Sequence, residues 1–243
     1  MKQLEGWKKM GRWRYFLGLS LLFNLVFIGV GVIKLAHRPN RTEKHASSSF
    51  GHYIQQKQAY YASHPVQEGD VVMVGDSHIE FFDFPEYVGQ VRNRGIRGDY
   101  SAHVAERVAT IAPYKPSKLF MEIGVNDLVF LGISPDSVVS NYAKALETMR
   151  RFSPDTKVFV QSILPVSEVH PEHPSLSHKN GVIQTANRLL QALCEKEKVV
   201  FVDLDPAFRL HGELDPRYTR DGIHLTEEGY RVWARILLPL IKE

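Results

Sequence analysis

The sequence has one cysteine, Cys194, among 243 residues. A single thiol excludes an intrachain disulfide and a metal site built from several cysteines. The missing disulfide does not by itself assign the protein to a compartment. The sequence also has no internal repeat, so the repeat architectures are not indicated.

Most of the chain lacks an excess of positive charge. The formal net charge is +3, but nine of the 30 Lys and Arg residues and two of the 27 acidic residues lie in residues 1–45. The remaining residues are therefore mildly acidic. A nucleic-acid-binding domain needs a basic face, so the composition argues against a nucleic-acid partner.

One long apolar run is present near the N-terminus. Residues 15–33, YFLGLSLLFNLVFIGVGVI, contain one asparagine and no charged residue. A helix crosses the bilayer core with about 20 apolar residues. The run exceeds the roughly 7–15 apolar residues of a cleaved signal peptide, and no small-residue cleavage motif follows it. It therefore predicts an uncleaved signal anchor.

Basic residues flank this run on both sides, with five before it and four soon after it. The positive-inside rule therefore favours a cytoplasmic N-terminus by a narrow margin. We expect a single-pass membrane protein whose folded domain lies on the periplasmic or extracellular side. The expected segments are a basic tail at 1–14, the anchor at 15–35, a polar linker at 36–50 and the folded domain at 51–243.

Short apolar runs alternate with longer helical segments in the rest of the chain. The predicted strands are 71–74, 91–93, 119–123, 157–163 and 199–204, and the predicted helices are 51–64, 101–111, 135–152, 180–197 and 227–241. This alternation is typical of parallel strands covered on both faces. We predict an α/β fold, a three-layer α/β/α sandwich with about five parallel strands. Ligands bind beyond the carboxyl ends of such strands.

The stretch VVMVGDSHIEFF, residues 71–82, places Gly75, Asp76 and Ser77 directly after the first predicted strand. These residue types form turns and cap helices, so the stretch alone favours an ordinary turn. The alternative is a serine nucleophile at a strand end. Such a serine needs a base, a carboxylate that orients the base, and donors that stabilise an oxyanion.

Candidates for all three partners occur elsewhere in the chain. In RDGIHLTEEGY, a tight turn can place the Asp221 carboxylate against Nδ1 of His224 and leave Nε2 free to face a serine. Asn126 follows the strand at 119–123 and can point its amide into a cleft. Gly95 and Gly98 can adopt positive φ and leave a backbone N–H unobstructed. Each of these residues is also an ordinary turn or loop residue when considered alone.

Taken together and in this order, the motifs resemble those of the SGNH or GDSL hydrolases. The matching blocks are GDS at 75–77, Gly98 within NRGIRGDYS, Asn126 within GVND, and Asp221 and His224 within DGIH. The resemblance covers about residues 65–243 and implies a flavodoxin-like SGNH fold. The phrases NRGIRGD and DGIHLTEEGY look most like the branch of platelet-activating-factor acetylhydrolase α-subunits and their bacterial relatives.

The resemblance implies a role for each matched residue. Ser77 is the nucleophile, His224 is the general base and then the general acid, and Asp221 orients His224. The oxyanion hole consists of the backbone N–H groups of Ser77 and Gly98 and the Asn126 amide. No metal or organic cofactor is implied. His78 stands where the family often has Leu, and we interpret it as a polar residue at the start of a helix, with substrate contact as the alternative.

Three histidines, His170, His173 and His178, lie in the Pro- and Ser-rich stretch 165–180. They have no fixed helical spacing, which favours a mobile loop beside the substrate over a metal site. Three further residues are expected to be structural: Asp99, Asp127 and Trp233.

The sequence thus predicts a membrane-anchored serine esterase acting on short acyl esters, such as acetyl groups on a glycan. A lysophospholipid or another lipid ester is the second choice of substrate. Transfer of the acyl group to a sugar is a further alternative. A tethered, non-catalytic binding module would be indicated by a missing triad or oxyanion residue, and all of them are present. The oligomeric state stays open.

Overall fold

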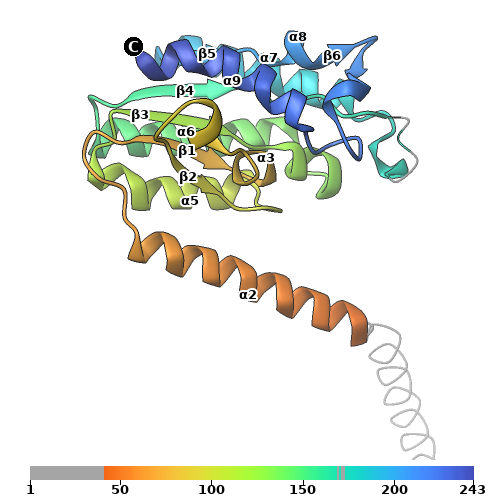
Figure 1. The fold of residues 1–243 in the computed structure, drawn as a ribbon, viewed down its shortest axis with the longest axis horizontal. Coiled ribbons are helices and arrows are strands. Elements are labelled where there is room, and N and C mark those ends of the chain that lie inside the picture. Colours follow the sequence, from red (N-terminus) through yellow and green to blue (C-terminus); the bar gives the residue numbers. More distant parts are fainter. Residues whose placement is uncertain (1–40, 169, 171–172) are drawn as a thin grey trace, which may run out of the picture. The chain divides into compact units, whose positions relative to one another are not determined.

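A computed structural model describes residues 41–168, 170 and 173–243 (Figure 1). The predicted signal anchor at 15–35 and the basic tail before it lie outside these residues. No helix within the described ranges has the length and apolar character needed to cross a bilayer. Residues 57–243 form one structural unit, and the described residues up to Gln56 belong to another.

Helix α2 (Arg41–Ser63) includes most of the predicted helix at 51–64 and also begins inside the segment 36–50, which the sequence predicts as a linker. The helical conformation of residues 41–50 has a local reason. This stretch contains no glycine or proline, and it includes the strong helix formers Glu, Lys and Ala. The serines that suggested a flexible tether are therefore compatible with helix.

The sheet contains five parallel strands: β1 (Val71–Gly75), β2 (Arg92–Gly95), β3 (Lys118–Glu122), β4 (Lys157–Gln161) and β5 (Val200–Val202). Their order is β2-β1-β3-β4-β5. The predicted α/β fold with five parallel strands is confirmed. The chain leaves β1 on one side to form β2 and then crosses to the other side to form β3. The carboxyl end of β1 is therefore the switch point at which α/β sheets bind ligands.

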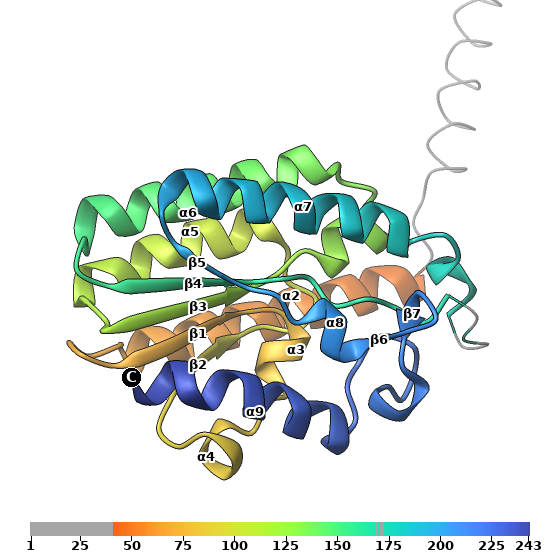
Figure 2. The same cartoon turned by 90° about the horizontal axis from the view of Figure 1, so that it is seen from above.

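Helices cover both faces of the sheet, as Figure 2 shows. One face carries α5 (Ser101–Ile111), α6 (Pro135–Phe152) and α7 (Asn180–Glu197), and the other carries α9 (Glu227–Lys242). The remaining short elements are α3 (Ser77–Glu80), α4 (Phe84–Tyr87), α8 (Asp205–Phe208), the hairpin β6 (Arg209–Leu210) and β7 (Glu213–Leu214), the turns η1 (Ala112–Tyr114), η3 (Pro174–Leu176) and η4 (Pro216–Tyr218), and the π-helical turn η2 (Asn126–Phe130).

Two apolar cores lie on the two faces of the sheet. Val72 and Val74 of β1 belong to the core beneath α5, α6 and α7, whereas Met73 belongs to the core beneath α9. This separation follows from the strand geometry, because successive side chains point to opposite faces. Trp233 of α9 is fully buried in the second core, as predicted, and its Nε1 donates a hydrogen bond of 2.7 Å to Oε1 of Gln161.

Gly95 ends β2, and the prediction that it adopts positive φ is wrong. Its backbone N–H is also engaged, because it donates to Oδ1 of Asn93 at 2.8 Å. Glycine is required here for a different reason. A Cβ atom on Gly95 would lie 2.2 Å from the backbone nitrogen of Glu80, so β2 and α3 can approach each other only without a side chain. The prediction for Gly98 is confirmed, with φ of +71°.

Candidate active site

Ser77 is the first residue of α3 and follows β1 after a single intervening residue, Asp76. Asp76 caps this short helix, because its Oδ1 accepts the backbone N–H of His78 at 3.0 Å. Gly75 allows the close contact between β1 and β3, since a Cβ there would lie 2.1 Å from the carbonyl oxygen of Glu122. Ser77 is therefore held at the carboxyl edge of the sheet, with 6% of its surface exposed.

His224 and Asp221 lie in the loop that leads into α9. Nε2 of His224 is 3.1 Å from Oγ of Ser77, and Nδ1 is 2.6 Å from Oδ2 of Asp221. The other carboxylate oxygen of Asp221 accepts the backbone N–H groups of Ile223 at 3.0 Å and of His224 at 2.8 Å. The structure thus brings the three sequence-predicted residues into one chain of hydrogen bonds.

The loop environment sets the charge of both partners of Ser77. Burial lowers the pKa of His224 below its ordinary value, although Asp221 acts in the opposite direction. Burial favours a neutral Asp221, but the hydrogen bonds from His224 and the backbone outweigh it and lower the pKa of Asp221 to about 2. At neutral pH, His224 is therefore uncharged and Asp221 is ionised, as a general base and its orienting carboxylate require.

The three predicted oxyanion donors lie on neighbouring turns. Among the described residues, the N–H groups of Ser77 and Gly98 have no protein acceptor. Nδ2 of Asn126 donates to the Asp99 carbonyl oxygen at 2.8 Å and makes a longer bond of 3.3 Å to Oδ2 of Asp76. The amide therefore bridges the turn that holds Ser77 and the turn that holds Gly98.

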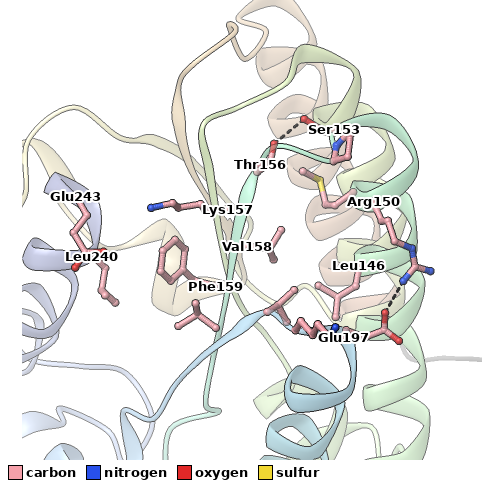
Figure 3. Close-up of a pocket in the computed structure, with 15 residues that line it drawn as sticks. Leu146, Arg150, Ser153, Thr156, Lys157, Val158, Phe159, Glu197, Leu240 and Glu243 are labelled. Atoms are coloured by element: carbon pink, nitrogen blue, oxygen red, sulfur yellow. Dashed lines mark hydrogen bonds and ion pairs between the residues drawn. The ribbon is translucent and has the colours of Figure 1, made fainter.

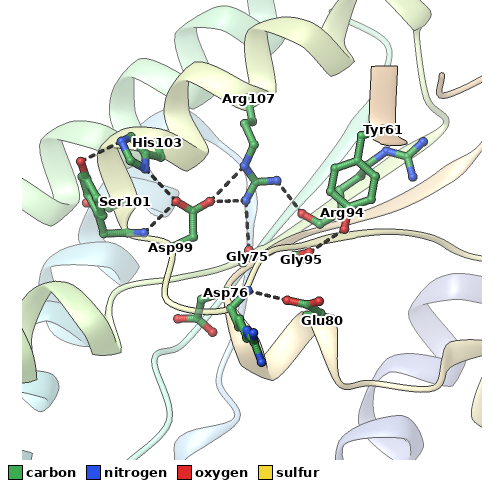
Figure 4. Close-up of polar contacts among 12 residues, drawn as sticks. Tyr61, Gly75, Asp76, Glu80, Arg94, Gly95, Asp99, Ser101, His103 and Arg107 are labelled. Carbon is green, nitrogen blue, oxygen red and sulfur yellow. Dashed lines mark hydrogen bonds and ion pairs between the residues drawn. The ribbon is translucent and has the colours of Figure 1, made fainter. Parts of the chain in front are cut away.

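Arg107 of α5 braces this end of the sheet, and the sequence analysis missed it (Figure 4). Its guanidinium donates to Oδ2 of Asp99 through Nε at 3.0 Å and Nη2 at 2.6 Å. It also donates to the carbonyl oxygens of Gly75 at 3.0 Å and Arg94 at 2.5 Å. The signal that could have revealed it is its place on the apolar face of α5, at helical spacing from Val104 and Ile111.

Replacement of Arg107 by Met is expected to destabilise the fold by about 3–5 kcal/mol, because the buried Asp99 carboxylate loses the guanidinium that pairs with its Oδ2. The matched control is Arg150→Met. Its ion pair with Glu197 is exposed, and such pairs contribute at most about 1 kcal/mol. Urea denaturation measures both free energies of unfolding. Equal losses for the two variants would contradict the bracing role.

The other acidic residues near the site have structural partners. Asp127 accepts the backbone N–H of Ser101 at 3.0 Å and its hydroxyl at 2.5 Å, which caps α5 from outside the helix. Asp99 accepts from Arg107 as described and from Nδ1 of His103 at 3.0 Å when that nitrogen carries a proton. These contacts agree with the structural roles expected for Asp99 and Asp127.

The histidine-containing stretch 165–180 packs against the loop that holds His224. The backbone N–H of Ser167 donates to the Gly222 carbonyl oxygen at 2.8 Å. Gly222 has φ of +91°, and a Cβ there would lie 2.8 Å from Cβ of His170. Residues 169, 171 and 172 lie outside the described residues. The stretch therefore adjoins the candidate site, on the side of the Asp221–His224 loop.

Two surface cavities differ in their distance from Ser77. One, of about 380 Å³, is lined in part by Phe81, Tyr87 and Arg220. The Phe81 ring lies 5.6 Å from the His224 ring, so this cavity borders the candidate site. A larger cavity of about 520 Å³ lies at the opposite, amino end of β4 and includes Lys157 (Figure 3). Cavity volume alone would therefore not select the cavity that borders the candidate site.

The family model of the GDSL-like lipase/acylhydrolase family matches residues 83–232. The chain belongs to this family. The matched segment contains Gly98, Asn126, Asp221 and His224, and it begins shortly after Ser77. The protein is thus an enzyme of the SGNH/GDSL hydrolase type.

Solved structures agree with this assignment. The hydrolase is similar to a structure described as a platelet activating factor from Streptococcus pneumonia, with 26% identity, a TM-score of 0.76, and coverage of 84% of this chain and 100% of that chain. It is also similar to an acylhydrolase from Bacteroides fragilis, with 26% identity, a TM-score of 0.66, and coverage of 78% and 94%.

Among curated proteins, the hydrolase is similar to an N-acylneuraminate cytidylyltransferase from Escherichia coli. The two are 22% identical over 181 residues, which is 71% of this chain and 40% of that protein. The hydrolase therefore spans about two fifths of the length of this relative.

Proposed function

We propose that this hydrolase is a membrane-anchored serine esterase in which Ser77, His224 and Asp221 act as a catalytic triad. The hydrogen-bond chain from Oγ of Ser77 through His224 to Asp221 carries the proposal. This chain lies at the carboxyl end of β1, where α/β sheets bind ligands.

In the first half of the reaction, neutral His224 accepts the Ser77 hydroxyl proton while Oγ bonds to the ester carbonyl carbon. The carbonyl electron pair moves to oxygen. The resulting oxyanion accepts hydrogen bonds from the N–H groups of Ser77 and Gly98 and from the Asn126 amide, whose longer bond to Asp76 gives way. His224 then protonates the leaving alcohol, and the acyl group stays on Ser77.

In the second half, water attacks the acyl-enzyme and His224 accepts the water proton. The second tetrahedral intermediate collapses, the Ser77 Oγ–acyl bond breaks, and His224 returns the proton to Oγ. Asp221 remains ionised throughout and stabilises the imidazolium in both halves. The low pKa of Asp221 supports this role.

We propose short acyl esters, such as acetyl esters of a glycan, as the substrates, and lipid esters as the rival class. The sequence phrases shared with the platelet-activating-factor acetylhydrolase branch support a short acyl group. The apolar run at 15–33 and its basic flanks support an anchor that holds the domain outside the cytoplasm.

The test is hydrolysis of p-nitrophenyl esters of increasing chain length by the full chain, together with labelling by a fluorophosphonate. We expect labelling at Ser77 and turnover that falls steeply beyond acetyl. A charged, membrane-impermeant ester should be hydrolysed by intact cells as well as by lysates. A preference for long acyl chains would indicate that lipid esters are the substrates. Absence of both labelling and turnover would contradict the triad and favour a binding module.

A further inference from the structure

Three ionisable side chains, Asp76, His78 and Glu122, are buried together beneath Ser77, and each is at most 1% exposed. Nδ1 of His78 is 3.8 Å from Oδ1 of Asp76 and 3.7 Å from Oε2 of Glu122. Nε2 of His78 is 3.0 Å from the carbonyl oxygen of Ile223. His78 lies in the first turn of α3, as predicted. Because it is buried, it is not a surface residue and is not exposed to substrate.

The contacts of His78 define where its protons lie. The Ile223 carbonyl can only accept, so Nε2 carries a proton. Within the described part of the chain, Nδ1 of His78 and both carboxylate oxygens of Glu122 have no other hydrogen-bond partner. If both carboxyl groups were ionised, a bare Nδ1 would face two buried carboxylates with no donor between them, which is costly in a low-dielectric interior. A second proton, on Nδ1, removes this conflict.

Charges in the cluster agree with that arrangement. Burial by itself lowers the pKa of His78, but Glu122 and then Asp76 more than offset it and raise that pKa to about 9. Burial, followed by the charge of Glu122, raises the pKa of Asp76 to about 8. At neutral pH these raised pKa values favour an imidazolium at His78 and a bound proton on Asp76.

His78 also connects the two segments that carry the proposed nucleophile and base. It follows Ser77 in α3, and the Ile223 carbonyl to which it donates belongs to the residue before His224. Its own carbonyl oxygen accepts the Tyr230 hydroxyl of α9 at 3.0 Å. The rings of His78 and His224 are 6.1 Å apart.

We propose that His78 is a positioning residue for ester hydrolysis: its imidazolium, held by Asp76 and Glu122, fixes the Ile223 carbonyl and thereby His224 against Ser77, and its charge keeps His224 unprotonated. The inference rests on the proposed function of Ser77 and His224. The charged groups that act on His224 are Asp221, which favours its protonated form, and His78 and Arg220, which oppose it.

The test uses the pH dependence of fluorophosphonate labelling at Ser77 in the full chain, because its acid limb reports the protonation of His224 without a known substrate. His78→Leu introduces the residue that the family often has. Loss of the nearby cation favours the His224 imidazolium, so we expect the acid limb to move up by about 1 pH unit. The labelling rate at neutral pH should fall about tenfold.

Two further variants separate charge from hydrogen bonding. His78→Gln retains a donor for the Ile223 carbonyl but has no charge, so it should recover part of the labelling rate and keep the shifted limb. Phe81→Leu is the matched control, because this uncharged ring from the same segment also lies beside His224. Its acid limb should stay at the wild-type position. Urea denaturation establishes that each variant is folded.

Several results would overturn the inference. If the wild type is labelled normally and the acid limb is unshifted in folded His78→Leu and His78→Gln, the role of His78 is contradicted. The proposed function of Ser77 and His224 is then unaffected. The three side chains also offer ligand atoms within 4.8 Å of one another. One equivalent of a divalent metal in the purified wild type, absent from His78→Leu, would therefore also contradict the role of His78. Absence of labelling in the wild type would overturn the proposed function together with this inference.

¹⁵N NMR of histidine-labelled protein provides a measurement that does not need activity. Both ring nitrogens of His78 should remain protonated at pH 8. A neutral ring at that pH would contradict the imidazolium, whatever the labelling shows.

Discussion

Ser77→Ala is expected to lower kcat/KM for ester hydrolysis by about 10⁴- to 10⁶-fold. The substitution removes the oxygen that forms the acyl-enzyme but leaves the backbone N–H at position 77 and the Asn126 amide in place. The remaining activity should therefore reflect only the polarisation of the ester carbonyl by these hydrogen-bond donors. Because Ser77 is almost fully buried and its hydroxyl contacts only His224 among the described side chains, the fold should tolerate alanine.

The matched control is Ser101→Ala. Ser101 is a second buried serine at the same edge of the sheet, but its hydroxyl donates to Asp127 and accepts from Asn141. Its loss should lower the urea midpoint and leave most of the turnover. Steady-state assays and urea denaturation of both variants make the comparison. Folded Ser77→Ala with more than about 1% of wild-type turnover would disprove the serine mechanism.

Asp221→Asn is expected to lower kcat by about 10⁴-fold, as loss of an orienting carboxylate does in other serine hydrolases. An asparagine amide can donate to Nδ1 of His224, which places the imidazole proton on Nε2. That tautomer cannot accept the Ser77 proton. Removal of the carboxylate also removes its contribution to the pKa of His224, so that pKa should fall further and the acid limb of the residual activity should move to lower pH.

Asp215→Asn provides the control in the same segment of the chain. Asp215 pairs with the exposed Arg217 and caps η4 rather than contacting His224. Its turnover should stay close to that of the wild type. The comparison is a pH–rate profile of kcat for the two variants. Similar losses in both would mean that Asp221 holds only the loop conformation and not the His224 tautomer.

The sequence predicted the central sheet because four of its five strands contain an apolar run, and β2, with the sequence RNRG, is the exception. It also predicted the site geometry, since Ser77, Asn126 and His224 follow or precede elements whose ends meet at one edge. The shared edge follows from parallel pairing, which the alternation of strands and helices indicates. The four-residue helices and the β6–β7 hairpin were not predicted, because segments this short produce no periodicity.

The sequence also did not predict the buried charged side chains. Glu122 appears in LFMEI as the polar end of an apolar strand, and nothing in its neighbourhood indicates that His78 lies beside it. The same is true of Arg107, whose acceptors come from β1, β2 and the turn at Asp99. Such side chains are identified by the packing of distant segments, which a single sequence does not display.

The chain distance between the proposed nucleophile and base has a consequence for biosynthesis. Oγ of Ser77 and Nε2 of His224 meet across 147 positions of sequence. The ribosome therefore synthesises the serine long before its base, and the base loop is held in place by α9, which is made later still. A nascent domain that has completed β1 to β5 already displays Ser77 but has no group to activate it. If Ser77 and His224 act as proposed, the chain cannot attack esters during its own translation, and the appearance of turnover would report that the final helix has docked.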